Sequence, residues 1–255
     1  MTALPLRITS HATTHEGKIR KNNEDSFCSR PDVGLWGVAD GMGGHENGEF
    51  ASAAIVEALG RVNLPERFET ACAAIAGAIH SANSLIHTKG ADGKDQMGST
   101  VVALFIRDRQ FGIFWVGDSR AYVLRHGELH QLSRDHTQVQ ALIDRGFMSE
   151  KDAESHPMAH ILARAVGVED TLELDVIVDE VLPGDIFMLC SDGLHGTMGH
   201  DEIMAFLETA ANGPVSEKMV ARTLELGAPD NVTVVIVAAH EPTLLSIGTP
   251  IETVR

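Results

Sequence analysis

Four aspartates lie where apolar runs of the sequence begin or end. Three of them end an apolar run and the fourth precedes one: they are Asp40, Asp118, Asp192 and Asp230. A single aspartate in such a position usually only starts a turn. Four such carboxylates suggest a shared chemical role, because carboxylate oxygens are ligands that hard divalent cations prefer.

The segment 24–40 predicts a hairpin whose two ends lie together. Its apolar runs, "DSFCS" and "LWGVA", flank the turn "RPDVG". In an antiparallel pair the start of one strand lies beside the end of the other, so Glu24 and Asp25 should lie beside Asp40.

The same geometry can bring Asp192, at a strand exit, beside Asp230, at a strand entry. If this rim coincides with that of the hairpin, five or six carboxylates share one site. Two unit charges about 4 Å apart repel by about 4 kcal/mol at an effective dielectric constant near 20. Such a cluster must therefore bind protons or cations, and we expect Mg²⁺ or Mn²⁺. Nearby glycines, Gly41, Gly43 and Gly44, would let the backbone turn sharply and bring the Gly41 carbonyl to an ion.

The remaining pattern predicts an α+β fold in which these carboxylates sit at strand ends. Apolar runs bounded by turn residues predict strands at 6–14, 25–30, 35–40, 99–106, 110–117, 121–127, 128–133, 171–181, 185–191 and 231–240. Helical spacing of apolar residues predicts helices at 49–61, 65–87, 200–211 and 215–227, and a mostly helical segment at 136–165. The strands are joined by tight turns, so the sheets should be mainly antiparallel.

Composition and charge exclude several classes of protein. The chain has 255 residues, of which 36 are acidic and 20 basic, giving a formal net charge of −16. This charge argues against a protein that binds nucleic acid or an anionic membrane. The three cysteines are far apart and form no CxxC pair, which favours free thiols in a reducing compartment. Without a signal-peptide pattern or an apolar run of about 20 residues, we expect a cytoplasmic protein.

Eight motifs follow one another along the chain. They are "GKIRKNNEDSF", "VADGMGGHENGE", "GST", "VGDSRAY", "LSRDHT", "LARAVG", "MLCSDGLHG" and "DNVTVVIV". With these motifs, residues 8–240 resemble the metal-dependent protein phosphatases of the 2C type, especially the compact bacterial ones. The resemblance implies an αββα sandwich of two mainly antiparallel sheets flanked by helices. It also implies one catalytic domain over residues 1–242 and a flap at about 137–165. After Pro242 the pattern of strands and helices ends, so we expect a loose tail at 243–255.

The resemblance implies a serine/threonine protein phosphatase that uses two or three Mn²⁺ or Mg²⁺ ions. A hydroxide bridging two of the ions would attack phosphorus directly, so no covalent phosphoenzyme would form. The implied partners are phosphorylated proteins and a cognate serine/threonine kinase.

The metal ligands implied by the resemblance come from several motifs. They are Glu24, Asp25, Asp40, Gly41, Asp118, Asp192 and Asp230. Asp40 would bridge two ions, and Glu24 and Asp25 would act through water. Asp118, sharing Asp192, would hold a weaker third ion.

Two further residues have candidate catalytic roles. Arg20 lies four residues before Glu24, where the family has its phosphate-binding arginine, and a guanidinium suits a phosphate dianion. The alternative role for Arg20 is a solvated surface charge. Many eukaryotic members have a histidine directly after the DG dipeptide, whereas this chain has Met42, which cannot donate a proton. His45 is then the candidate general acid, and the alternatives are a rim histidine or a proton supplied by water.

Two other functions remain open from the sequence. A catalytically inactive relative could bind phosphoproteins as a regulator, although it would be free to lose the acidic residues. A metal-dependent small-molecule phosphatase is the other alternative. We expect the flap at 137–165 to set substrate preference and His136 to fix a loop. The chain has no GxxxxGK[ST] loop and no HExxH motif, which argues against a nucleotide-binding module and a zinc peptidase.

Overall fold

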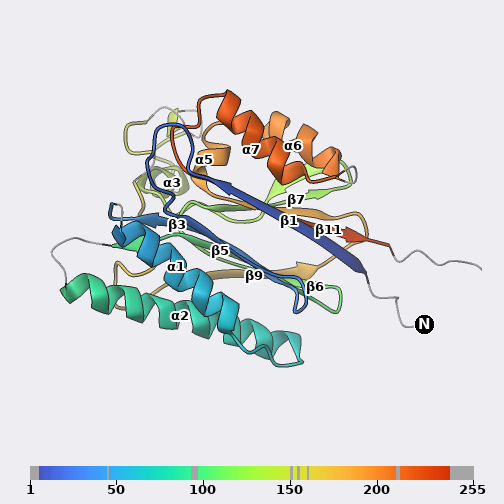
Figure 1. The fold of residues 1–255 in the computed structure, drawn as a ribbon, viewed down its shortest axis with the longest axis horizontal. Coiled ribbons are helices and arrows are strands. Elements are labelled where there is room, and N and C mark those ends of the chain that lie inside the picture. The colour runs from blue at the N-terminus through green and yellow to red at the C-terminus, as the bar shows by residue number, and fades with distance from the viewer. Residues whose placement is uncertain are drawn as a thin grey trace, which may run out of the picture.

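Two stacked antiparallel sheets, with helices on both outer faces, form the four layers of the fold (Figure 1). The structure is a computed structural model that describes residues 6–44, 46–92, 97–149, 152–153, 156–159, 161–210 and 213–241. The first sheet has the order β1 (Arg7–His15), β11 (Val232–His240), β10 (Ile186–Cys190), β7 (Arg120–Arg125) and β8 (Glu128–Gln131). The second has the order β2 (Asp25–Arg30), β3 (Leu35–Met42), β5 (Val101–Arg107), β6 (Gln110–Val116) and β9 (Asp175–Glu180), and the short β4 (Gly98–Ser99) pairs with β3. The predicted αββα sandwich is confirmed.

The helices lie on opposite sides of the sandwich. α1 (Glu46–Arg61) and α2 (Phe68–Asp92) cover the second sheet, whereas α5 (Asp192–His195), α6 (His200–Glu208) and α7 (Val215–Glu225) cover the first (Figure 1). α5 was not predicted, because one turn of helix is too short to show a periodic pattern. None of the helices within the described residues has the length and apolar character of a membrane-spanning helix.

Three apolar clusters separate the four layers. The middle cluster lies between the two sheets and includes Trp36, Val102 and Phe187. Leu35 and Phe105 belong to the cluster between the second sheet and the helices α1 and α2. The third cluster lies between the first sheet and α5, α6 and α7. Because both faces of the central strands are covered, these strands are apolar at successive positions instead of alternating positions.

Tight hairpins set the strand register, as the turn residues predict. Asp108 and Arg109, between β5 and β6, have φ angles of 49° and 65°. His126 and Gly127, between β7 and β8, have φ angles of 53° and 80°. Two successive residues with positive φ are typical of the two-residue turns whose twist matches that of antiparallel strands.

The flap differs from the sequence prediction. Residues 136–165 were expected to be mostly helical, but α3 (Gln138–Asp144) is the one helix with assigned bounds in the described part of this segment. Thr137 caps the start of α3, since its hydroxyl accepts a hydrogen bond from the Gln140 N–H, and the chain turns at Gly146 with a φ of 72°. Positive φ is incompatible with a continuing helix, so the helix stops there. The predicted loose tail at 243–255 lies outside the described residues.

Candidate metal centre

Acidic residues from both sheets meet at one end of the sandwich. Asp25 and Asp40 are direct partners in the β2–β3 pairing, as the hairpin predicts. In the first sheet, the Ser191 N–H donates to the Thr233 carbonyl (3.1 Å), so the chain just before Asp192 lies beside the start of β11. A cavity of about 350 Å³, which we call the acidic cavity, lies between the two rims. The sequence-predicted site residues that line it are Arg20, Glu24, Asp40, Gly41, Asp118, Asp192 and Asp230.

Asp25 lies behind this lining and is buried. Its Oδ2 atom accepts hydrogen bonds from the hydroxyls of Ser191 and Thr233, both at 2.7 Å. Its Oδ1 atom is buried and has no hydrogen-bond partner among the described residues. Burial raises the pKa of Asp25 to about 7 and nearby Asp192 and Asp230 add to the rise, whereas the two hydroxyls oppose it. A buried carboxylate oxygen without a partner requires a proton or a cation.

The surroundings of Asp40 and Asp118 also disfavour the charged forms of these carboxyl groups. Burial raises the pKa of Asp40 well above its usual value, and neighbouring carboxylates, led by Asp25, raise it further. Burial also raises the pKa of Asp118 to about 7, with a further contribution from Asp192. Carboxylates that repel one another in this way bind divalent cations favourably, because the cation removes the repulsion.

The backbone of Asp40 is fixed by Ser99, the last residue of β4, and by Thr100, which follows it. The Thr100 hydroxyl accepts a hydrogen bond from the Asp40 N–H (3.0 Å). The Thr100 N–H (2.8 Å) and the Ser99 hydroxyl (2.9 Å) both donate to the Asp40 carbonyl. The "GST" motif therefore positions Asp40, a role that the sequence alone did not reveal.

Glycines permit a close approach of chain segments around the acidic cavity. Gly43 and Gly44 have φ angles of 118° and 81°, so the chain does turn sharply after Asp40. Gly41 serves a different purpose: a Cβ atom there would lie 2.0 Å from the Gly48 carbonyl oxygen. A Cβ atom at Gly48 would in turn lie 1.9 Å from Glu24 Oε2. These two glycines let α1 begin directly beside Glu24.

Arg20 lies at the rim of the acidic cavity and pairs with Asp230. Its guanidinium donates to Asp230 Oδ2 at 2.6 Å, and its side chain is 56% exposed. Of the two roles that the sequence left open for Arg20, the position at the rim favours contact with a bound anion. His45, the candidate general acid, lies outside the described residues, and Met42 lines the acidic cavity.

Asn231 and His195 hold predicted site residues in place, but the sequence did not predict this role for either of them. Asn231 accepts a hydrogen bond from the Glu24 N–H (2.8 Å) and donates to the carbonyls of Glu16 and Asn22. His195 Nε2 lies 3.0 Å from the Asp118 carbonyl oxygen. Both lie close in sequence to a predicted ligand, in "PDNVT" and "SDGLH", and this proximity was the available signal.

His136 fixes a loop, as expected. Its backbone N–H donates to the Gly117 carbonyl (2.9 Å), and its Nδ1 atom accepts from the Gly117 N–H (3.2 Å). Its Nε2 atom lies 3.1 Å from Asp175 Oδ2. His136 therefore holds the turn that presents Asp118.

The donor set fits magnesium or manganese. It consists of carboxylates and the Gly41 carbonyl, which are hard oxygen ligands, with no thiolate or imidazole among the described residues that line the acidic cavity. Within the described ranges, no three Asp, Glu, His or Cys side chains are close enough to share one ion in this conformation. Ion binding therefore requires side-chain rotations that bring these oxygen ligands closer together. The unpartnered Oδ1 of Asp25 and the raised pKa values favour such a rearrangement.

Comparison with known proteins gives consistent matches over most of the chain. A family model described as Protein phosphatase 2C matches residues 14–231. The serine/threonine protein phosphatase PstP of Mycobacterium tuberculosis is 34% identical over 238 residues, covering 92% of this chain and 46% of PstP. The chain thus spans about half the length of that relative. The serine/threonine phosphatase stp of Listeria monocytogenes is 34% identical, covering 88% of this chain and 93% of stp.

Solved structures agree with the sequence matches. PppA, described as a key regulatory component of T6SS in Pseudomonas aeruginosa, has a TM-score of 0.84 and 39% identity, covering 91% of this chain and 97% of PppA. The catalytic domain of PstP in complex with two manganese ions has a TM-score of 0.80 and 33% identity, covering 92% of this chain and 99% of that domain.

Proposed function

The chain belongs to the protein phosphatase 2C family, and from that premise we propose that it is a metal-dependent serine/threonine protein phosphatase. One observation carries the proposal: carboxylates from both sheets converge on a single acidic cavity that has Arg20 at its rim. The catalytic domain is proposed to span residues 1–242. The proposed cofactors are Mn²⁺ or Mg²⁺, held by Glu24, Asp25, Asp40, Gly41, Asp118, Asp192 and Asp230.

Each part of the site has a proposed role in hydrolysis. When bound, divalent cations lower the pKa of water and offset negative charge on a phosphoryl group. Asp40, at the end of β3, would be a ligand of the cations in the acidic cavity. The Arg20 guanidinium orients the phosphate through paired hydrogen bonds. Met42 cannot donate a proton to the leaving alcohol, so His45 remains the proposed general acid.

The three cysteines do not supply a nucleophile. All are free, and Cys28 and Cys190 are buried. Burial raises the pKa of Cys190 to about 12 and that of Cys72 to about 11, so both remain thiols near neutral pH. A thiol is a poor nucleophile compared with a thiolate. This supports direct attack by water and argues against a cysteinyl-phosphate intermediate.

Phosphorylated proteins are the proposed substrates, and a cognate serine/threonine kinase is the proposed opposing enzyme. The formal charge of −16 is unfavourable for a nucleic-acid partner. A cytoplasmic location is consistent with the three free thiols.

A turnover assay tests the proposal. p-Nitrophenyl phosphate and a phosphothreonine peptide are incubated with Mn²⁺, with EDTA, and with the variant Asp192→Ala. We expect metal-dependent turnover that Asp192→Ala reduces at least 100-fold. The control is Asp32→Ala, which removes an exposed carboxylate from the turn at the opposite end of the β2–β3 hairpin.

Three results would contradict the proposal in different ways. Turnover that EDTA does not reduce would exclude the metal-dependent mechanism. Manganese binding without turnover would indicate an inactive regulator. Hydrolysis of small phosphate esters but not of the peptide would indicate a small-molecule phosphatase.

A further inference from the structure

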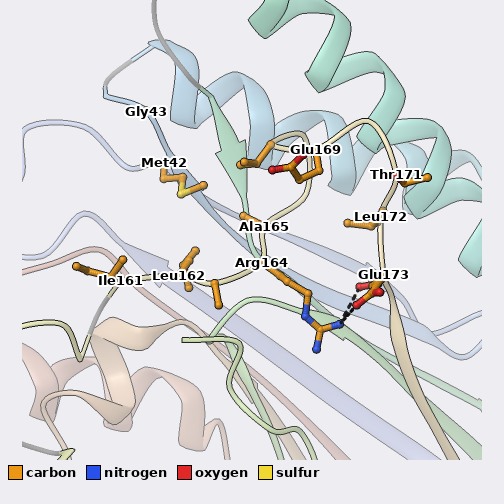
Figure 2. A pocket seen from close by; sticks show the side chains of 12 residues that line it. Met42, Gly43, Ile161, Leu162, Arg164, Ala165, Glu169, Thr171, Leu172 and Glu173 are labelled. Carbon is orange, nitrogen blue, oxygen red and sulfur yellow. Dashed lines mark hydrogen bonds and ion pairs between the residues drawn. The ribbon is translucent and has the colours of Figure 1, made fainter. Parts of the chain in front are cut away.

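A second cavity of about 650 Å³ adjoins the acidic cavity. We call it the side cavity; it lies between the end of β3 and residues 161–173 (Figure 2). Met42, Gly43 and Leu162 line both cavities. A molecule bound in the acidic cavity therefore has direct access to the side cavity.

The walls of the side cavity are largely apolar. Met42, Leu162 and Leu172 face it from three directions (Figure 2). Gly98 lets the side chains of Met42 and Val168 pack closely against the backbone of β4. A Cβ atom at Gly98 would lie 2.8 Å from Met42 Cε and 2.9 Å from Val168 Cγ2. A cavity of this size and composition suits an apolar side chain.

The charged groups of the side cavity do not form a second anion site. The Arg164 guanidinium lies 3.4 Å from Glu173 Oε2 and 3.3 Å from Asp175 Oδ1, so two carboxylates already offset its charge. Glu169 and Glu173 are exposed at the rim. The rim is therefore acidic on balance, which disfavours acidic side chains and phosphate.

Hydrogen bonds hold the wall of the side cavity in place. The buried Asn83 of α2 donates to the carbonyls of Glu169 (3.0 Å) and Asp170 (3.1 Å). Its side-chain oxygen accepts from the Gly167 N–H at 2.7 Å. A wall fixed in this way is preorganised for a ligand, because little conformational entropy is lost on binding.

We propose that the side cavity binds an apolar side chain of a phosphopeptide substrate, one or two residues from the phosphorylated residue. This inference rests on the proposed phosphatase function. Successive residues of an extended peptide are about 3.3–3.6 Å apart, so a side chain one or two residues from a phosphate in the acidic cavity reaches the adjoining side cavity. The cavity then selects substrates by an apolar neighbour of the phosphothreonine.

Matched peptides test this selectivity. Each carries one phosphothreonine in a glycine- and serine-rich background, with leucine or glycine at −2, −1, +1 or +2. We expect kcat/KM for the leucine peptide to exceed that for its glycine partner about tenfold at one of these positions. Aspartate at that position should lower kcat/KM below the glycine value.

Two variants assign the selectivity to the side cavity. Ile161→Asp places a charge in its wall. Leu226→Asp makes the same kind of change directly after α7, where the side chain is equally accessible (44% and 43% exposed). Ile161→Asp should abolish the tenfold preference for leucine and leave turnover of p-nitrophenyl phosphate unchanged, whereas Leu226→Asp should change neither. Leu172→Ala enlarges the cavity and should shift the preference from leucine towards phenylalanine, with thermal unfolding as the check on folding.

The possible failures are distinguishable. Equal kcat/KM for leucine and glycine peptides at all four positions would overturn the inference and leave the phosphatase function intact. A preference that persists unchanged in both Ile161→Asp and Leu172→Ala would also overturn it. Absence of metal-dependent turnover of every substrate would remove the proposed function and this inference together.

Discussion

The orientation of Asp25 depends on a chain of hydroxyl groups. The Asn23 side chain donates to the Thr14 hydroxyl (2.8 Å), which lies 2.7 Å from the Thr233 hydroxyl, and Thr233 donates to Asp25 Oδ2. The hydroxyls of Thr233 and Ser191 both donate to Oδ2, which leaves Oδ1 as the oxygen without a partner among the residues that the structure describes. No motif in the sequence indicated this arrangement, because its members come from three separate segments.

Replacing Thr233 by valine tests the importance of this chain. Thr233→Val keeps the shape of the side chain but removes its hydrogen bond to Asp25. We expect the Kd for Mn²⁺ to rise about tenfold, because groups that orient metal ligands typically contribute that much. Isothermal titration calorimetry measures the affinity. The control is Thr9→Val, which removes a hydroxyl that bonds His240 at the far end of β1. Equal Kd values for Thr233→Val and wild type would contradict this role.

The raised pKa of Asp118, about 7, makes the stability of the metal-free protein depend on pH. The folded state binds this proton more tightly than the unfolded chain, whose aspartate pKa is about 4. Wild-type protein therefore loses stability as pH rises from about 4 to about 7, and Asp118→Asn lacks this loss.

In EDTA we expect Asp118→Asn to match wild type near pH 4 and to unfold several degrees higher at pH 8. Differential scanning calorimetry across this range measures the effect, with the exposed Asp32→Asn as control. A difference in Tm that does not change with pH would show that Asp118 is not a buried, protonatable carboxyl.

At the scale of elements, the junction of β3 and α1 is set by glycines. The sequence predicted the β2–β3 hairpin and most of α1, because both produce local patterns of apolar residues. It did not predict that Gly41 and Gly48 are in contact, because contact between a strand end and a helix start follows from packing. The expectation that residues 136–165 are mostly helical was wrong for a similar reason: the described part of this segment includes the bridge between Thr137 and Leu162, which joins positions far apart in sequence.

Alanine substitutions should separate two effects at this junction. At Gly41 the new Cβ would meet a backbone oxygen at 2.0 Å, so we expect Gly41→Ala to lower the free energy of unfolding by about 2–4 kcal/mol. At Gly48 the new Cβ would meet the end of the Glu24 side chain, which can move. Gly48→Ala should therefore fold but bind Mn²⁺ about tenfold more weakly.

Gly60 provides the control in the same helix. A Cβ atom there meets no atom of the described residues within 4 Å, so Gly60→Ala should leave Mn²⁺ affinity unchanged and stabilise α1 by about 0.5–1 kcal/mol. Chemical denaturation and metal titration measure both quantities. Similar behaviour of all three variants would exclude a special role for the junction.

At the scale of the whole molecule, the acidic cavity exists because two sheets end at the same place. The sequence predicted each rim separately. The rim formed by β2 and β3 could be predicted because these strands are neighbours in the sequence and pair as a hairpin. Whether the rims coincide depends on how the sheets stack, through a core that includes Trp36 and Phe187. No local pattern encodes that stacking, and only the resemblance to a known family suggested it.

Metal binding should therefore stabilise the whole fold, and in a pH-dependent way. At 100 times Kd, a ligand that binds only the folded state contributes about 2.7 kcal/mol. We expect Mn²⁺ to raise Tm by about 5–10 °C at pH 8. The increase should be much smaller at pH 5, where protons occupy Asp25 and Asp118, whose pKa values are about 7. Calorimetry with and without Mn²⁺ gives the comparison, and an equal increase at both pH values would contradict it.

The ion pair between Arg20 and Asp230 has a consequence for the order of events. If Asp230 turns towards an incoming cation, the Arg20 guanidinium loses its hydrogen-bond partner and its charge is less fully offset, with Glu24 and Asp192 still nearby. Loading with metal thus also prepares the entrance for an anion. A protein built this way would discriminate against phosphorylated ligands until its cations have arrived.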